Sequence, residues 1–435
     1  MKKKSPLLAE RMHYRSLATN ITYYVKVLGK YNHTSMLLAV QRLPQIHPIL
    51  NVNVVEEDDE NIYYVHDTKN CPTLRLYSED TNILIATEYK RSFSMNHDCM
   101  ARFFVQDKGE YFSLVMVAHH IIGDARSILI LLCDLLTLYG GGSVEAVDEP
   151  VLLSESAQFS ENVKLSTQLK FYVDYLNTKW KKEKRLFSDK EFNEVHSKFH
   201  ESHDICFASL CFGNEETERM HSQCRQHKVT ITSALSTLIL RSIHETLSDY
   251  FCNDMQINIP VSIKKEFDCI PQRCAGNYCS NISLKYKYKE AMDFWVETEQ
   301  FHSKMTQKLN DNAGRYLALN MMIAIDGTLQ DAISFSAFGD FDSLIAKQMA
   351  ELVNISKKLA NIEVSNIGQT SINKCIGENE LSNILYIPPL DTSYALTLGV
   401  IGFDDRINLC MVYDAAVIPE SKITDLTNHI KEICS

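Results

Sequence analysis

The sequence contains no CxxC pair, although thirteen cysteines are scattered over its 435 residues. Structural zinc sites are usually built from such closely spaced pairs. The nearest group, Cys269, Cys274 and Cys279, lacks that spacing, so we expect no metal site. An odd, scattered set of cysteines also makes a poor disulfide framework, and it predicts reduced thiols in a cytoplasmic protein.

Long apolar runs are also missing. The most apolar stretch, residues 127–139, is too short to span a bilayer and contains Asp134, so it predicts a buried helix. The lysines at the start are not followed by an apolar segment, so we expect no secretory signal. A formal net charge of −11 argues against a nucleic-acid-binding protein, because such a protein would carry a basic face.

The length and the pattern of the chain predict two domains. A chain of 435 residues is too long for one ordinary hydrophobic core. Strands and helices are expected both before and after an acidic, serine-rich stretch at 143–165. We therefore predict an α/β fold of two sandwich halves, with a first domain at 1–150, a linker or crossing segment at 151–195 and a second domain at 196–435.

Individual elements follow from the hydrophobic periodicity. In the first half we expect a strand at 111–120, followed by the apolar helix that ends at the glycines 140–142. The residues FDDR at 403–406 are typical of a hairpin turn. In the second half the expected strands lie at 205–212, 255–263, 280–288, 361–366, 394–403 and 406–414, with helices near 166–185, 290–309, 341–359 and 420–433.

Two adjacent histidines and an aspartate stand where the strand at 111–120 gives way to the apolar helix. Side chains alternate along a strand, so His119 and His120 must point to opposite faces, and only one can reach a given cleft. One interpretation is structural: a buried histidine, a partly solvated one, and Asp124 as the N-cap of the helix, which stabilises by about 1 kcal/mol. The other interpretation is that one histidine has a chemical role.

The pattern His119-His120-Ile121-Ile122-Gly123-Asp124 resembles the HHxxxD motif of the condensation-domain and acyltransferase superfamily, which includes chloramphenicol acetyltransferase. Alanine stands where the family usually has glycine after the aspartate. The best match is to alcohol acetyltransferase-like proteins, because further segments follow in family order. These segments are LLAERMHYRS (7–16), the region that starts with ICFASLCF (205–212), INIPVSIKK (257–265), GNYCSNISL (276–284) and VSNIG (364–368).

The resemblance implies a fold and a set of site residues. It implies two chloramphenicol-acetyltransferase-like domains that form a pseudo-dimer with an active-site tunnel between them. His120 would be the general base, with His119 beside it, and transfer would be direct, without an acyl-enzyme. Asp124 would be architectural and would pair with Lys264, which stands where the family has arginine. Ser365 and Asn366 would reach the tunnel as donors to the oxyanion, although they also fit the end of a strand.

The resemblance also implies an activity: an O-acyltransferase that moves an acyl group, most simply acetyl, from coenzyme A to a small-molecule alcohol, within one monomer and without a metal. Amide formation, by N-acylation or by condensation, is the alternative, and so is a catalytically silent protein that only binds in the tunnel. We recognise no carrier domain in the chain, so a carrier protein would act in trans. The candidate cations for the phosphates of coenzyme A are Lys264, Lys265, Arg273, Lys357 and Lys358.

Overall fold

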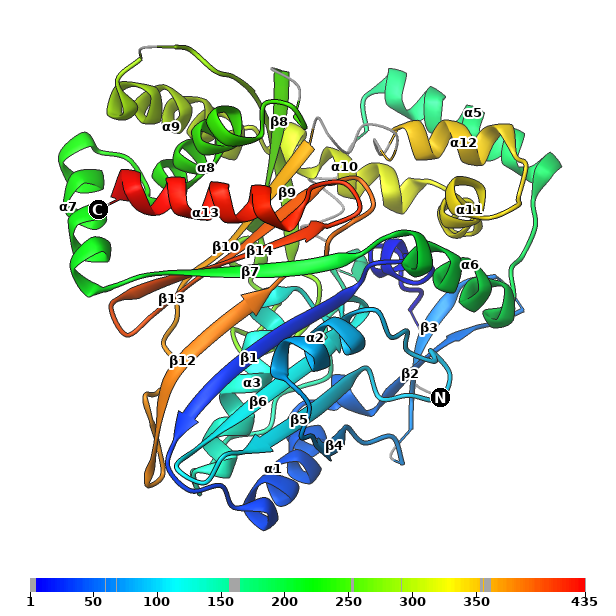
Figure 1. Cartoon of the computed structure of the whole chain (residues 1–435). Helices are drawn as coiled ribbons and strands as arrows, with labels where there is room; N and C mark the ends of the chain where they lie inside the picture. The colour runs from blue at the N-terminus through cyan, green and yellow to red at the C-terminus, as the bar shows by residue number, and fades with distance from the viewer. Residues whose placement is uncertain are drawn as a thin grey trace.

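The computed structural model places two six-stranded sheets in the chain, each covered by helices (Figure 1). It describes residues 5–58, 60–67, 69–155, 165–251, 254–290, 292–352, 355 and 361–434. The predicted mixed α/β architecture of two halves is therefore confirmed.

The first sheet has the strand order β11-β12-β1-β6-β5-β4, and its neighbours are antiparallel except for the parallel pair β4 and β5. Its strands are β1 (Asn20–Leu28), β4 (Thr73–Leu76), β5 (Ala101–Asp107), β6 (Tyr111–His119), β11 (Cys375–Ile376) and β12 (Asn379–Ile387). Helices α1 (His33–Ile46), α2 (Thr81–Tyr89) and α3 (Ala125–Tyr139) pack against this sheet or against one another. A two-stranded ribbon of β2 (Val52–Glu56) and β3 (Ile62–His66) lies beside it.

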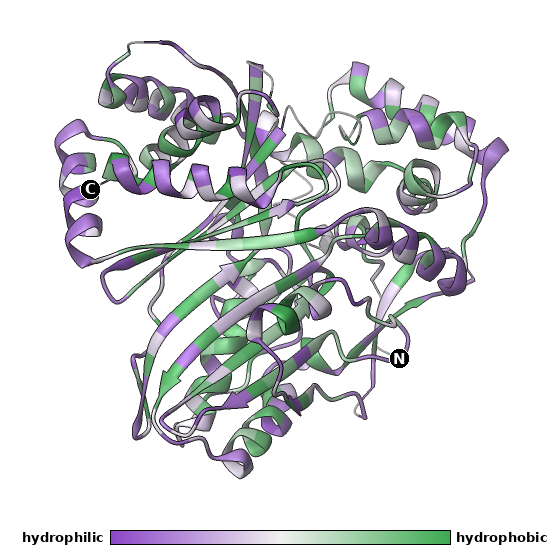
Figure 2. Cartoon of the chain, viewed as in Figure 1, coloured by the Kyte–Doolittle hydropathy of each residue, from purple (hydrophilic) through white to green (hydrophobic). Residues whose placement is uncertain are grey.

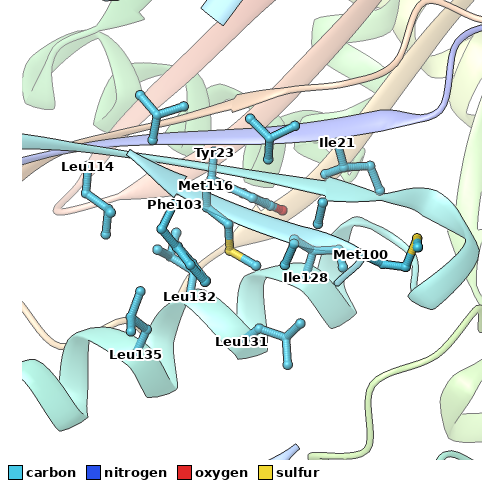
Figure 3. Close-up of a cluster of buried hydrophobic side chains, with 14 of the residues drawn as sticks. Ile21, Tyr23, Met100, Phe103, Leu114, Met116, Ile128, Leu131, Leu132 and Leu135 are labelled. Carbon is cyan, nitrogen blue, oxygen red and sulfur yellow. The ribbon is translucent and has the colours of Figure 1, made fainter. Parts of the chain in front are cut away.

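The apolar helix predicted at 127–139 is α3, and its leucines supply the core of the first half. Figure 3 shows its apolar side chains beneath the strands, where they meet residues of β1, β5 and β6. All of the labelled residues are almost completely buried: Ile21, Tyr23, Met100, Phe103, Leu114, Met116, Ile128, Leu131, Leu132 and Leu135. Because this burial holds α3 firmly, it also holds the turn from which α3 starts.

The second sheet has the order β7-β14-β13-β10-β8-β9, in which β10 runs parallel to both of its neighbours. Its strands are β7 (Ile205–Phe212), β8 (Asp254–Ser262), β9 (Cys279–Lys287), β10 (Asn361–Gln369), β13 (Leu396–Phe403) and β14 (Arg406–Asp414). The predicted hairpin is confirmed, since Phe403 pairs with Arg406 and both turn aspartates have positive φ. Figure 2 shows many hydrophilic residues on the outer helices α7 (Asn214–His227), α9 (Phe294–Asn310) and α13 (Glu420–Cys434), whereas α8 (Ile231–Leu247) is mostly buried.

The predicted ranges 1–150 and 196–435 do not each hold a complete sheet. β11 and β12 come from the second range but belong to the first sheet, where β12 pairs with β1. The hydrophobic periodicity did not predict β12, because polar and apolar residues do not alternate regularly along this strand. The range 151–195 contains a full helix and the start of another. The helices not yet named are α5 (Thr167–Glu183), α6 (Asp189–Ser202), α10 (Asn312–Ala324), α11 (Gly327–Phe338) and α12 (Leu344–Leu352).

A buried arginine near the start of the chain ties these parts together. Arg11 lies in the short 3-10 helix η1 (Glu10–His13) and contacts Asp331 on α11, with 2.5 Å between Nη2 and Oδ2. The same guanidinium donates to the carbonyl of Glu60 at 2.6 Å and reaches the Glu56 carboxylate at 3.1 Å. Burial raises the pKa of Asp331 to about 6, against the opposing effect of Arg11. η1 is therefore held from both halves.

Removing this arginine should strongly destabilise the protein. Arg11→Met leaves Asp331 buried without its partner, for which we expect a loss of about 3–5 kcal/mol in the free energy of unfolding by urea. The double variant Arg11→Met, Asp331→Leu should lose less than the sum of the two single variants. Lys198→Met is the control, because Lys198 pairs with Asp340 on the surface. Equal melting of Arg11→Met and wild type would show that the contact does not hold η1.

Candidate active site

The HHxxxD segment forms a tight turn between β6 and α3. β6 ends at His119, and His120–Ile122 form the 3-10 helix η3. The turn closes because the backbone N–H of Ile121 donates to His119 Nδ1 at 3.1 Å. Gly123 follows, and a Cβ there would come within 2.9 Å of the Ser127 side chain and 3.5 Å of the Gly276 backbone. The absent side chain therefore lets the turn pack closely against Ser127 in the first turn of α3.

Asp124 joins the two halves at this turn. Its Oδ1 accepts a hydrogen bond from the backbone N–H of Ser127 at 2.8 Å, which makes it the N-cap of α3. Its Oδ2 accepts from the backbone N–H of Tyr278 at 2.9 Å, and its own N–H donates to the carbonyl of Gly276 at 3.1 Å. Asp124 is buried. The carboxylate is thus held by backbone N–H groups from both halves, and its structural role does not need a cation.

The predicted ion pair between Asp124 and Lys264 is not present among these contacts. Lys264 Nζ donates instead to the carbonyls of Gln272 at 2.8 Å and Cys274 at 2.5 Å. Burial lowers the pKa of Lys264, while the more distant carboxylate of Asp124 opposes that shift. The ammonium is thus directed to backbone carbonyls of its own segment and not to Asp124. The lysine therefore stabilises its own loop.

His119 belongs to the core of the first half. Its Nδ1 accepts from Ile121, so the proton must be on Nε2, which lies 2.8 Å from the Thr19 hydroxyl. The ring is 3% exposed and meets the edge of Phe93. Burial, with smaller effects of His120 and Arg102, lowers its pKa to about 3. Since both nitrogens are used within the protein, we correct the expectation that His119 is catalytic and assign it a structural role.

His120 has the opposite tautomer, which follows from its contact with Asn277. The Asn277 Nδ2 donates to the carbonyls of His120 at 2.9 Å and Ile121 at 3.0 Å, so the amide can have only one orientation. Its Oδ1 then faces His120 Nδ1 at 3.0 Å and can only accept. The proton of the neutral ring is therefore on Nδ1, and Nε2 carries a lone pair. Burial lowers the pKa of His120, so the ring is neutral at pH 7.

A second imidazole lies directly on His120. The ring of His13, at the end of η1, stacks on it with centroids 4.0 Å apart and an interplanar angle of 16°. Burial, together with the neighbouring His120 and His119, lowers the pKa of His13 well below its usual value. Both rings lie deep in the protein, and each residue keeps some accessible surface. The site therefore contains two neutral imidazoles.

The predicted oxyanion donors use their polar groups elsewhere. Ser365 Oγ lies 3.1 Å from the Tyr386 hydroxyl, and Asn366 Nδ2 donates to the Thr232 hydroxyl at 3.0 Å. Asn366 Oδ1 accepts from the backbone N–H of Gly368 at 2.8 Å. The two residues are consecutive on β10, so their side chains leave opposite faces of the sheet. The structure does not bring either one to His120 by a hydrogen bond.

The second sheet turns a polar face toward the first half. On β10, Glu363 lies opposite the apolar face, and burial and the Asp391 carboxylate raise its pKa to about 8. Burial lowers the pKa of His120, and the Asp391 carboxylate is among the groups that oppose this shift. It lines, with Tyr394, a cavity of about 70 Å³ next to α6. The face of the second sheet that carries Glu363 is therefore polar and buried.

The predicted phosphate cations are not gathered in one place. Arg273 binds Asp134 at 2.7 Å and donates to the carbonyl of Glu145 at 3.0 Å, while Lys264 is used as described above. Lys265 is exposed. Lys357 and Lys358 lie outside the described residues. Within the described residues, no cluster of His, Cys, Asp or Glu could hold a metal ion, and no helix is long and apolar enough to cross a membrane.

The comparisons with known proteins agree with this geometry. The sequence profile of the condensation-domain family matches residues 5–326. The chain belongs to this family. Tyrocidine synthase 3 of Brevibacillus parabrevis is 26% identical to this chain over 144 residues, which is 33% of this chain and 2% of that protein. The chain therefore matches only a small part of that relative.

Condensation-domain and acetyltransferase structures share the fold. The trichothecene 15-O-acetyltransferase of Fusarium sporotrichioides has a TM-score of 0.68 at 10% identity, covering 99% of this chain and 94% of that one. The first condensation domain of the calcium-dependent antibiotic synthetase gives 0.65 at 12% identity, with 98% and 93% covered. Polyketide synthase associated protein 5 from Mycobacterium tuberculosis gives 0.62 at 10% identity, with 100% and 99% covered. Such low identities establish the two-lobed fold alone.

Two residues of this condensation-domain site were missed by the sequence analysis. Asn277 lies in the segment 276–284, which resembles the family as a whole and does not single out one residue. An asparagine after a glycine usually indicates a turn. His13 precedes His120 by more than one hundred residues, so no spacing connects them. A sequence signal for either would have required knowledge of which segments meet in space.

The two adjacent histidines should show opposite tautomers. We expect His120 to carry its proton on Nδ1 and His119 on Nε2 in proton–nitrogen correlation spectra of protein labelled with 15N-histidine, assigned with His120→Gln and His119→Gln. Asn277→Ala should turn His120 into a mixture of tautomers, because the acceptor for Nδ1–H is lost, and leave His119 unchanged. Asn193→Ala, an exposed asparagine, is the control. A proton on Nε2 of His120 in the wild type would contradict the assignment.

His119 should make the protein sensitive to acid. Its pKa is about 3 in the folded protein and about 6.5 in the unfolded chain. Below pH 6.5 the unfolded chain binds a proton that the folded protein does not, so stability falls as the pH drops toward 3. His119→Asn keeps an acceptor for the Ile121 N–H but cannot titrate. Its urea midpoint should therefore fall less than that of wild type between pH 6.5 and 5.

The matched control for this variant is His33→Asn, which removes an exposed histidine from the start of α1. Identical pH slopes for wild type and His119→Asn would show that His119 is charged in the folded protein and that its burial has been misjudged.

Proposed function

We propose that the protein is an acyltransferase that transfers an acyl group, most simply acetyl, from a coenzyme A thioester to the hydroxyl of a small molecule. His120 is the general base. The observation that carries the proposal is the contact with Asn277, because it leaves His120 Nε2 unprotonated at the point where the two halves meet. A neutral imidazole in this orientation can accept the proton of a hydroxyl group.

The reaction follows from the acid–base role of this ring. Nε2 takes the proton from the acceptor hydroxyl while its oxygen attacks the thioester carbonyl, and Asn277 stabilises the charge that appears at Nδ1–H. When the tetrahedral intermediate collapses, the thiolate of coenzyme A leaves and takes the proton from the imidazolium. Asp124 contributes by holding the turn, and no covalent acyl-enzyme or metal is part of this sequence.

Two observations support an acyl donor of this kind. A protein with the same fold over nearly its whole length is a trichothecene 15-O-acetyltransferase, and a starter condensation domain of rhizomide synthetase with this fold is described in complex with C8-CoA. We propose that both lobes of one monomer suffice for the site. A cytoplasmic location rests on the reduced thiols that the sequence predicts.

Amide formation is the second candidate. The polar interior contains two carboxyl groups, Glu363 and Asp391, which suit an acceptor with an amino group. The relative tyrocidine synthase 3 is matched over a short segment. In this case the acyl group would come from coenzyme A or from a carrier protein acting in trans. A protein that only binds in the channel would have no need of a base with a fixed tautomer.

A panel of thioesters and acceptors tests the proposal. Acetyl-CoA and octanoyl-CoA would be incubated with alcohols and amines, with free thiol and product mass as the measurements. We expect an ester product, a rate about 10²–10⁴-fold lower for His120→Ala, and an unchanged melting temperature. His97→Ala is the control, because that side chain is exposed. Because burial lowers the pKa of His120, kcat/KM should remain high below pH 6.5 and fall only at more acid pH.

Each outcome of this experiment is informative. Normal turnover by a folded His120→Ala protein would overturn the mechanism. Amide products alone would select the second candidate, and thioester binding without turnover would select the silent protein.

A further inference from the structure

The proposed reaction needs a donor for the negative oxygen of the tetrahedral intermediate, and the expected donors Ser365 and Asn366 each have a hydrogen-bond partner within the protein. Such donors contribute about 10²–10³ in rate when they are aimed at the place where the charge develops. Ser365 and Asn366 bond to other side chains and backbone, and both hydrogen atoms of the Asn277 amide go to carbonyls. Neither Asn366 nor Asn277 therefore has an amide hydrogen free for the oxyanion.

His13 has the position that such a donor needs. Its ring stacks on His120 at 4.0 Å and nearly parallel, so the edges of the two rings lie side by side. A group bound to the edge of one ring is therefore adjacent to a group bound to the edge of the other. The hydroxyl that loses its proton and the carbonyl that it attacks are such a pair of neighbours.

The hydrogen-bonding capacity of His13 is unused. Among the residues that the structure describes, neither ring nitrogen of His13 has a hydrogen-bond partner, whereas both nitrogens of His119 and one of His120 do. A polar ring deep in a protein without a partner is unusual and costs stability. The His13 ring keeps some accessible surface, so its nitrogens are open to a molecule in the channel.

The His13 ring is also neutral and held in place. Its low pKa keeps it neutral, so it has one N–H donor and does not compete for the proton that His120 must accept. Arg11, two residues earlier, anchors η1 to Asp331 and to the Glu60 carbonyl. A donor that is held before the reaction begins does not need to reorganise as charge develops.

We propose that His13 donates a hydrogen bond to the carbonyl oxygen of the acyl donor and stabilises the oxyanion of the tetrahedral intermediate. This inference rests on the proposed function. As the acceptor oxygen attacks, its proton passes to His120 Nε2 and the carbonyl π electrons move to the oxygen, which the His13 N–H binds. Collapse of the intermediate restores the carbonyl and expels the thiolate, which takes the proton from His120.

Three variants of His13 separate the donor from the stacked ring. His13→Phe keeps an aromatic ring over His120 but has no N–H, His13→Gln keeps an N–H without a ring, and His13→Ala has neither. We expect kcat to fall about 10²–10³-fold for His13→Phe and His13→Ala, with the KM for the thioester within about twofold of wild type. His13→Gln should be faster than His13→Phe. The acid limb of kcat/KM should remain in His13→Phe, because it belongs to His120.

Wild type and His120→Ala are measured in the same assay, with melting temperatures for every variant. If wild type does not transfer an acyl group, or if His120→Ala transfers it normally, the proposed function fails regardless of His13. If those two behave as expected, a His13→Phe protein with near-normal kcat, or one faster than His13→Gln, overturns the inference and shows that the ring only packs. Should His13→Phe be unfolded, the comparison of His13→Gln with His13→Ala decides: equal rates overturn it.

Discussion

The two hydrogen bonds that backbone N–H groups donate to the Asp124 carboxylate are the constraint on which the site depends. One comes from the first turn of α3 and the other from the segment that carries Asn277. If either half shifted, the amide of Asn277 would leave the carbonyls of the HHxxxD turn, and His120 would lose the partner that sets its tautomer. A buried carboxylate is tolerated only when such donors replace water. An aspartate that touches no substrate can therefore be as necessary as the base itself.

His119 and His120 have different hydrogen-bond partners because β6 ends between them. His119 faces the apolar core and bonds to the turn and to Thr19, which fully occupies its nitrogens. His120 faces the other half, where an amide oxygen occupies one nitrogen and leaves the second open. The same side chain, one residue apart, thus has its proton on opposite nitrogens, and its chemistry follows from its neighbours.

Local features of this protein could be predicted from the sequence, and long-range ones could not. The end of the strand, the N-cap at Asp124 and the hairpin at 403–406 depend on residues within a few positions of one another, and they were predicted. Asn277 and His13 depend on segments that meet only after folding. The expected pair of Asp124 and Lys264 is absent for the same reason: the family resemblance pointed to a cation, but the partner from the distant segment is the backbone N–H of Tyr278, while Lys264 binds two backbone carbonyls.

β12 has a consequence for how the protein is made. Its partner β1 ends at residue 28, whereas β12 begins at residue 379, so β1 lacks its neighbour on that side until nearly the whole chain has left the ribosome. An unpaired strand edge can join another chain, and pairs so distant in sequence form slowly. During synthesis the first sheet is therefore incomplete, and one edge of β1 stays unpaired until β12 has been made.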